Sequence, residues 1–311
     1  MRIGFVGIGS IAKRHINNMY ELFKDRKEEL IIDLFRSGNG GKLPADIAEK
    51  IHMVYQISEP IKEQYDAIFI TNPTNMHYHT LLQFKDASNA FFVEKPVFDF
   101  YTDDIESLKL SGDKVYYVAC PLRYTSVIQY VKENINFDQV YALRAISSSY
   151  LPDWRPGVDY RTTYSANKQQ GGGVAIDLIH EWDYLTYLIG LPRTVQCLIK
   201  KVSPLEIDSD DLAIYIADYN DKTVELHLDY FGRSPIRKLE IFMHDDTIEC
   251  DLLGSTIHFL KEKKIIDFKQ DRNDFQKKEL EYFWGIIEGK WQNENTISHA
   301  CEVLKLTGVK M

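Results

Sequence analysis

Short apolar runs alternate with helix-compatible stretches through the first 120 residues of the chain. Most of these runs are apolar at successive positions, which is typical of parallel strands buried on both faces. Their alternation with helices predicts a doubly wound parallel sheet, an α/β fold. The predicted strands cover residues 2–7, 30–35, 53–57, 66–71, 90–94 and 114–119, and the predicted helices cover 11–24, 44–51, 75–87 and 101–111.

From about residue 137 the rhythm changes, because several strands follow one another with short polar turns between them. Such turns are typical of antiparallel hairpins. The predicted strands cover residues 139–152, 193–203, 211–219, 223–230, 236–243 and 246–252, and helical stretches near 273–289 and 294–309 close the chain. The sequence therefore predicts two domains: residues 1–120, and an α+β domain over residues 121–311 with a large, mainly antiparallel open sheet.

The composition is that of a soluble globular protein, with 44% hydrophobic and 27% charged residues among 311. A net charge of −9 argues against a nucleic-acid or anionic-membrane partner. No apolar run approaches the roughly 18 residues of a membrane span. The first apolar run leads into Lys13-Arg14-His15 and not into a small-residue cleavage site, so we expect no signal peptide. Four widely separated cysteines fit reduced thiols in the cytoplasm.

Gly7-x-Gly9-x-x-Ala12 follows the first predicted strand and opens the first predicted helix. Gly7 would form a tight turn, Gly9 would let the backbone approach a pyrophosphate, and Ala12 would allow close helix–strand packing. Backbone N–H groups at the helix start, around Ser10 and Ile11, would face the phosphates. In this context the motif predicts a Rossmann-type dinucleotide-binding domain over residues 1–120. Chance glycines in a turn are the alternative.

The end of the second predicted strand bears on the choice of dinucleotide. NAD-specific sites usually carry an acidic residue there to bind the ribose hydroxyls. Here Arg36-Ser37 stand near that position, and Asp33 lies too early in the strand. An arginine and a hydroxyl suit a 2′-phosphate, so we expect NADP(H) to be preferred, with NAD(H) as the alternative.

Further polar segments follow the fourth and fifth predicted strands, where ligands bind in doubly wound sheets. Together with the glycine motif they match one family in order and spacing, over more than half of the chain. The matching residues are His15, Thr71, Asn72, Pro73, His77, Glu94, Lys95, Pro96, Arg123, Tyr124 and the glycine-rich segment 171–183. The sequence resembles the Gfo/Idh/MocA family, named for glucose–fructose oxidoreductase, inositol dehydrogenase and the rhizopine-catabolism protein MocA.

The resemblance implies an oxidoreductase with a nicotinamide cofactor. The implied cofactor contacts after the fourth and fifth strands are Thr71, Asn72, Pro73, His77, Glu94 and Lys95. Lys95 would also reach the substrate oxygen, and the Lys95–Pro96 bond is a candidate cis peptide. Independently of the resemblance, a lysine beside a carboxylate at a crevice can polarise a reacting oxygen or share its proton. A strand-end ion pair of little consequence is the alternative.

The segment "GGGVAIDLIHEWDY" predicts a glycine loop that leads into a helix, with Asp177, His180 and Glu181 on one face. Histidine is well suited to take a proton near neutral pH, and a neighbouring carboxylate would orient its ring. The resemblance implies catalytic roles for His180 and Asp177 at the substrate hydroxyl. Asp177 stands three and not four residues before the histidine, so Asp183 and Glu181 are alternatives for its role. A core histidine is the alternative for His180.

The loop "LPDWRPGVDYRTTYSANK" is rich in arginine and tyrosine. Arg155, Tyr160 and Arg161 would bind an anionic, carbohydrate-like substrate, and a plain surface loop or oligomer contact is the alternative. Arg123 and Tyr124 are further candidates for substrate binding. We expect no metal site, because residues 208–211 are best explained as a solvated turn.

The sequence thus predicts hydride transfer between a nicotinamide and a sugar, sugar-acid or nucleotide-sugar alcohol or ketone, with Lys95 and His180 handling the proton. One alternative is a glycoside-cleaving enzyme of the same fold that retains NAD. The other is a non-catalytic dinucleotide-sensing protein. The second domain would bind substrate, and an apolar outer sheet face would mediate a homodimer or homotetramer.

Overall fold

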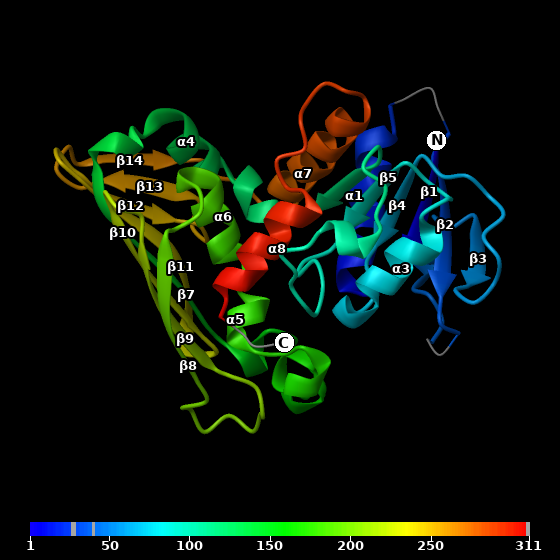
Figure 1. The fold of residues 1–311 in the computed structure, drawn as a ribbon, viewed down its shortest axis with the longest axis horizontal. Helices are drawn as coiled ribbons and strands as arrows, with labels where there is room; N and C mark the ends of the chain where they lie inside the picture. The colour runs from blue at the N-terminus through cyan, green and yellow to red at the C-terminus, as the bar shows by residue number, and fades with distance from the viewer. Residues whose placement is uncertain (26–28, 39–40, 309–311) are drawn as a thin grey trace. The chain divides into compact units, whose positions relative to one another are not determined.

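A computed structural model describes residues 1–25, 29–38 and 41–308. The chain divides into two compact units, each with its own sheet (Figure 1). The first unit contains residues 1–119 and 272–302, and the second contains residues 120–271 and the chain from 303 onward. Residues 272–302 were expected in the second domain, and the structure corrects that assignment.

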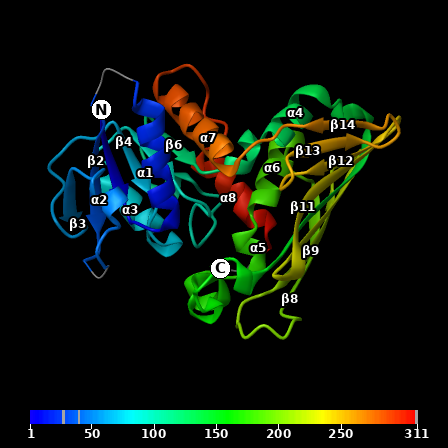
Figure 2. The same ribbon diagram turned by 180° about the vertical axis from the view of Figure 1, so that it is seen from behind.

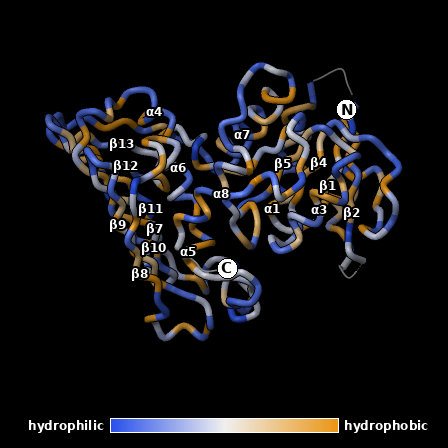
Figure 3. The backbone as a smooth tube through the Cα atoms, viewed as in Figure 1, coloured by the Kyte–Doolittle hydropathy of each residue, from blue (hydrophilic) through white to orange (hydrophobic). Residues whose placement is uncertain are grey.

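The first sheet has six parallel strands in the order β3-β2-β1-β4-β5-β6, which confirms the predicted Rossmann-type fold. The order changes direction between β1 and β4, so these two strands form the switch point at which such sheets bind ligands. Figure 3 shows the hydrophobic character of the central strands, and β4 and β5 are buried at every position. The strands are β1 (Arg2–Val6), β2 (Ile31–Arg36), β3 (Met53–Gln56), β4 (Ala67–Ile70), β5 (Ala90–Val93) and β6 (Val115–Val118).

The helices of the first unit are α1 (Ser10–Phe23), α2 (Ala45–Ala48), α3 (His77–Phe84) and α7 (Arg272–Ile287). α7 belongs to this unit because its apolar side packs on the sheet and beside α1 (Figure 2). The ring of Phe283 lies 5.7 Å from that of Phe69 and 5.3 Å from that of Phe92. Trp284 meets Phe23 of α1 edge-on at 5.4 Å. Periodicity alone could not show which sheet these aromatic side chains cover.

The predicted helix over residues 101–111 was wrong, since the structure has only a short 3₁₀ turn, Glu106–Leu108. The Thr102 hydroxyl accepts a hydrogen bond from the Asp104 N–H at 3.0 Å, and the Asp104 carboxylate accepts one from the Ser107 N–H at 3.1 Å. Local side-chain bonds of this kind compete with the helical pattern. Lys109 then adopts a positive φ of 54°, which ends the turn.

The second sheet has eight strands in the order β14-β13-β12-β11-β7-β10-β9-β8, and every pair except β7–β10 is antiparallel. This confirms the predicted large, mainly antiparallel sheet. Its last two strands, β13 and β14, were not anticipated, because each has four residues and β14 is largely exposed. The strands are β7 (Val140–Tyr150), β8 (Thr194–Lys200), β9 (Leu212–Asp218), β10 (Thr223–Asp229), β11 (Phe231–Met243), β12 (Thr247–Asp251), β13 (Thr256–Phe259) and β14 (Lys264–Asp267).

Helices cover one face of the second sheet and leave apolar side chains exposed on the other. The helices of this unit are α4 (Ser126–Asn134), α5 (Val174–Asp177) and α6 (His180–Ile189), and the boundary between the units falls within α8 (Ile297–Leu306). α5 contacts β9 and β10, and α6 contacts β7. On the outer face Leu198, Ile216 and Ile265 are 45%, 46% and 62% exposed. No helix in the described part of the chain is long and apolar enough to cross a membrane.

We expect Phe283→Ala to lower the free energy of unfolding by about 3–5 kcal/mol, because it removes a buried aromatic ring between α7 and the first sheet. Urea titration followed by circular dichroism measures the change. Met53→Ala, at an exposed apolar site of the first unit, is the control and should change stability by less than about 0.5 kcal/mol. A loss below about 1 kcal/mol for Phe283→Ala would contradict the packing of α7 on the first sheet.

Candidate active site

The turn after β1 carries the first predicted cofactor residues. Gly7 has a φ of +93°, and a Cβ at this position would lie 2.7 Å from the Cα atom of Asn72. Only glycine fits there. The Gly7 N–H donates to the Phe35 carbonyl at 3.0 Å, so the turn is fixed against β2 as well as against the end of β4.

Gly9 differs from Gly7, because no neighbouring atom requires a glycine at that position. Its φ is −70°, and the place that a Cβ atom would occupy has no neighbouring atom within 4 Å. Gly9 is the N-cap of α1, and no side chain caps this helix. The open space and the uncapped N–H groups around Ser10 and Ile11 fit a dinucleotide pyrophosphate. Ala12 is fully buried, as close helix–sheet packing requires.

The end of β2 matches the arrangement expected from the sequence. Asp33 lies inside the strand and is fully buried, where its carboxylate accepts hydrogen bonds from Arg2 at 2.8 Å and from the Tyr65 hydroxyl at 3.0 Å. The Asp33 carboxylate therefore binds Arg2 and Tyr65 inside the sheet and does not stand at the end of the strand. Arg36 is the last residue of β2 and donates to the Gly41 carbonyl at 2.9 Å, and Ser37 beside it is exposed.

At the end of β4, the predicted cofactor residues form hydrogen bonds with neighbouring backbone and side-chain groups. The Thr71 hydroxyl donates to the carbonyls of Val6 and Gly7 at 3.0 and 3.1 Å, so it holds the glycine turn. The Asn72 amide donates to the Thr80 hydroxyl at 2.8 Å, and Pro73 is exposed. His77 is 1% exposed, with one ring nitrogen 3.0 Å from the Asn72 carbonyl oxygen. Thr71 and His77 thus contact the backbone of the turns at the edge of the sheet.

At the end of β5, Glu94 and Lys95 join the same edge. The Glu94 N–H donates to the Ile70 carbonyl of β4 at 3.0 Å, and its carboxylate lies 2.7 Å from a ring nitrogen of His15. Lys95 is half-buried, and the Lys95–Pro96 peptide bond is cis, which confirms the prediction. Because β1, β4 and β5 are neighbouring parallel strands, their carboxyl ends place the glycine turn, Asn72 and Lys95 along one edge.

In the second unit, the glycine-rich segment leads into α5 and places Asp177. Gly173 has a φ of +137°, and a Cβ there would collide with the carboxylate of Asp210. Asp177 ends α5, is 4% exposed, and accepts a hydrogen bond from the Tyr230 hydroxyl at 2.5 Å. Burial, and then the Asp177 charge, raise the pKa of Tyr230, so this phenol stays a proton donor. Burial likewise raises the pKa of Asp210.

The predicted single helical face with Asp177, His180 and Glu181 was wrong. Leu178 leaves the helical conformation, so α5 ends at Asp177 and α6 begins at His180. Glu181 is fully buried and pairs with Arg237 of β11 at 2.7 Å. The half-buried His180 stands at the first position of α6, directly after this break.

Asp183, the other alternative carboxylate, forms a buried ion pair. Its two oxygens accept hydrogen bonds from Arg123 at 2.8 and 2.9 Å, and Arg123 is 3% exposed. The Arg123 guanidinium also lies 5.0 Å from the ring centre of Tyr187. The predicted substrate residue Arg123 therefore fastens α6 to the 3₁₀ turn Pro121–Tyr124, which also contains Tyr124. Asp177 remains the better candidate beside His180.

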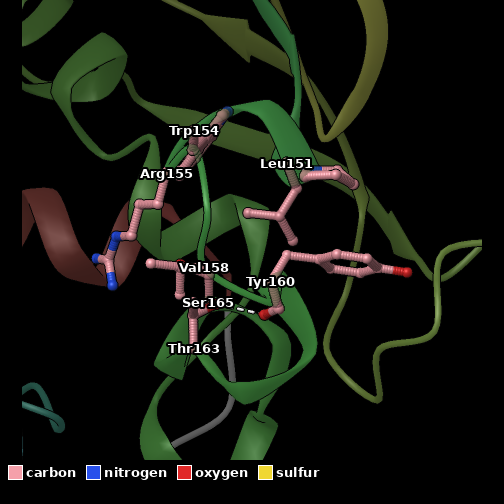
Figure 4. Close-up of a pocket in the computed structure, with 8 residues that line it drawn as sticks. Leu151, Trp154, Arg155, Val158, Tyr160, Thr163 and Ser165 are labelled. Carbon is pink, nitrogen blue, oxygen red and sulfur yellow. Dashed lines mark hydrogen bonds between the residues drawn. The ribbon is translucent and has the colours of Figure 1, made fainter.

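The three predicted substrate residues of the arginine- and tyrosine-rich loop do not converge. Arg155 and Tyr160 line a small hollow and extend from it in different directions (Figure 4). Arg161 is exposed and pairs with Asp159 at 2.8 Å and with Glu206 at 2.7 Å. The Arg155 guanidinium instead lies 5.7 Å from the ring centre of Tyr164. The Arg155 guanidinium is therefore the group of this loop that would bind an anion.

Sequence reasoning missed the roles of Tyr230, Asp210 and His15. Tyr230 follows β10, more than 50 positions after Asp177, and Trp154 packs edge-on against its ring at 5.2 Å. No local spacing links these residues. His15 was noted only as part of the glycine motif. Among the described residues, no group of three or more His, Cys, Asp or Glu side chains is placed to hold a metal ion.

Comparison with known protein families agrees with this geometry. Residues 1–111 match the model of an oxidoreductase family with an NAD-binding Rossmann fold, GFO_IDH_MocA, and residues 128–249 match the C-terminal domain model of the same family. The chain belongs to the Gfo/Idh/MocA family. A curated relative, the uncharacterized oxidoreductase YrbE of Bacillus subtilis (strain 168), is 26% identical over 197 residues. That match covers 60% of this chain and only 53% of the relative's length.

Solved structures of other proteins share the fold over 99% of this chain. UDP-N-acetylglucosamine 3-dehydrogenase GnnA from Acidithiobacillus ferrooxidans has a TM-score of 0.75, 20% identity and 95% of its chain covered. The WlbA dehydrogenase from Bordetella pertussis, in complex with NADH and UDP-GlcNAcA, has a TM-score of 0.78, 16% identity and 94% coverage. Myo-inositol 2-dehydrogenase from Lactobacillus plantarum has a TM-score of 0.75, 17% identity and 95% coverage.

We expect Asp183→Asn to lower the free energy of unfolding by about 3–5 kcal/mol, because it leaves the buried Arg123 guanidinium without its carboxylate. Chemical denaturation measures the loss. Glu206→Gln removes a carboxylate from the exposed pair with Arg161 and should cost less than about 1 kcal/mol. Equal effects of the two variants would contradict a structural role for Asp183.

Proposed function

We propose that this protein is an NAD(P)-dependent oxidoreductase that acts on an alcohol or ketone group of a sugar-like substrate. The observation that carries the proposal is the edge of the first sheet, where an uncapped helix N-terminus and the open approach at Gly9 lie on the same edge as Lys95. The turn itself does not require glycine at position 9, because a Cβ atom there would have no neighbouring atom within 4 Å. Membership in an oxidoreductase family supports the same conclusion.

The residues that would hold the dinucleotide come from the first unit. The N–H groups at the start of α1 suit the pyrophosphate, and the end of β2 suits the adenosine ribose. A bound nicotinamide would supply the hydride chemistry. Because Thr71 and His77 bond to backbone carbonyls, their contribution would be to hold the turns that contact the cofactor.

Lys95, His180 and Asp177 would handle the substrate oxygen. Lys95 would donate a hydrogen bond to the reacting oxygen, and His180 would take or return its proton, as histidine does near neutral pH. Asp177, already fixed by Tyr230, would orient the reacting groups as a buried hydrogen-bond acceptor. Lys95 belongs to the first unit, and His180 and Asp177 belong to the second.

A carbohydrate or nucleotide sugar is the substrate class that the comparisons favour. Structural neighbours include dehydrogenases named for UDP-N-acetylglucosamine, myo-inositol and levoglucosan. In this chain Arg155 beside Tyr164 is the part of the loop that could meet an anionic group while an aromatic ring packs on a sugar. These three compounds form the first substrate panel for an activity assay.

Titration with NADPH and NADH, followed by nicotinamide fluorescence, tests the cofactor assignment. We expect tighter binding of NADPH, because Arg36 and Ser37 stand at the ribose end of β2 while Asp33 is occupied inside the strand. Arg36→Ala should weaken NADPH binding about 10- to 100-fold and change NADH binding little. Tighter binding of NADH by the unaltered protein would overturn the Arg36 assignment. If cofactor-free protein bound neither dinucleotide, the enzyme proposal itself would fail.

We expect Lys95→Gln to lower kcat about 10²- to 10⁴-fold on any substrate that the panel identifies, because the variant loses a proton donor at the reacting oxygen. Steady-state kinetics measure kcat, and the fluorescence titration shows whether the dinucleotide still binds. Lys62→Gln, at an exposed position in the same unit, is the control and should retain activity. Full activity of Lys95→Gln would exclude the proposed role.

The exposed apolar side chains on the outer face of the second sheet support a homodimer or homotetramer. Leu198→Lys combined with Ile216→Lys should shift the protein toward the monomer, because it places charges in an apolar contact. Light scattering on the unaltered and altered proteins measures the mass. A monomeric mass for the unaltered protein would refute this part of the proposal.

A further inference from the structure

A buried histidine connects the phosphate-binding helix to the end of β5. His15 lies in α1, 1% exposed, and its Nε2 atom is 2.7 Å from the Oε1 atom of Glu94. Glu94 immediately precedes Lys95 in the chain. The proposed reaction assigns no proton or hydride step to this histidine.

The surroundings of the His15 ring indicate which nitrogen carries its proton. The ring centre lies 5.0 Å from that of Phe92, edge-on, and 5.9 Å from that of Phe69. The Nδ1 atom is buried and has no hydrogen-bond partner among the described residues. A buried N–H donor without an acceptor is costly, so the proton belongs on Nε2, where the Glu94 carboxylate accepts it.

Lys95 lies between two anchored residues. Before it, Glu94 is held by its N–H to the Ile70 carbonyl at 3.0 Å and by its side chain to His15. After Pro96, the Val97 carbonyl oxygen lies 3.1 Å from the Nδ1 atom of His77. Burial lowers the pKa of His77. A neutral imidazole has one N–H, so it donates to one of its two carbonyl neighbours, Val97 and Asn72, at a time.

We propose that His15 is a positioning residue for Lys95. His15 acts through the Glu94 carboxylate and ties the backbone at Lys95 to α1, the helix that faces the cofactor phosphates. This inference rests on the proposed function for its catalytic consequence, while its structural part stands on the contacts above. One rigid helix would then fix both the pyrophosphate and the start of the Lys95 segment. Errors of about 1 Å in such placement can cost about 10²-fold in rate.

A second histidine–carboxylate pair in the same unit provides a matched comparison. His52 lies 3.1 Å from Asp33, but its side chain is 55% exposed and it stands before β3. Loss of the His52 imidazole therefore removes a similar contact with no connection to Lys95. The two pairs separate positioning of the lysine from a general contribution to stability.

The test compares His15→Phe, which keeps an aromatic ring and removes the donor, with His15→Gln, whose amide N–H stands near the Nε2 position. For His15→Phe we expect kcat to fall about 10- to 100-fold while the dissociation constant of the dinucleotide changes less than about 3-fold. His15→Gln should recover most of that loss, and His52→Gln should match the unaltered enzyme. Equal kcat values for His15→Phe and His52→Gln, or no recovery in His15→Gln, would overturn the proposal.

Hydrogen exchange provides a readout that needs no substrate. Peptides that cover residues 93–99 should exchange faster in His15→Phe than in the unaltered protein or in His52→Gln, because the anchor before Lys95 is lost. Unchanged exchange would overturn the positioning role even in an active enzyme. If exchange is faster in His15→Phe but the unaltered protein has no dehydrogenase activity, the contact between His15 and Glu94 stands as a structural anchor of the Lys95 segment and the proposed function is rejected instead.

Discussion

The close approach of the Gly7 backbone to Asn72 is the constraint on which the first half of the proposed site depends. A side chain at position 7 would collide with the main chain that follows β4. The hydroxyl of Thr71 reinforces this contact by binding the carbonyls of Val6 and Gly7. Because β5 pairs with β4 in parallel, the segment with Lys95 is carried to the same edge as the glycine turn.

Ion pairing of buried carboxylates decides which acidic residues are available for chemistry. Isolated buried charges are unfavourable, so each needs a partner. Asp183 has Arg123, and Glu181 has Arg237. Asp177 accepts a hydrogen bond from the hydroxyl of Tyr230. That hydrogen bond fixes the position of the Asp177 carboxylate.

The local pattern predicted elements correctly where side-chain packing agrees with it. It failed where local side-chain hydrogen bonds replace a helix, and it could not show which distant segments come into contact. Most strands of the first sheet are apolar at successive positions, so their number and parallel arrangement follow from the sequence. The segment 101–111 has helical periodicity, yet the side chains of Thr102 and Asp104 capture its backbone N–H groups. The aromatic residues of α7 also fit an ordinary amphipathic helix, and only their contacts with Phe69 and Phe92 show which sheet they cover.

The sequence by itself predicted that both sheets and the glycine turn exist, because the apolar pattern of most strands and the spacing of the glycines are local features. The cis Lys95–Pro96 bond was expected from the resemblance to the family. Tertiary structure alone decided the partners of the buried charged residues Arg123 and Glu181, since those partners lie far away along the chain. Arg123 was expected at the substrate and is buried against Asp183, 60 positions later. His15 and Glu94 are 79 positions apart, and only the pairing of parallel strands beneath α1 brings the imidazole to the carboxylate.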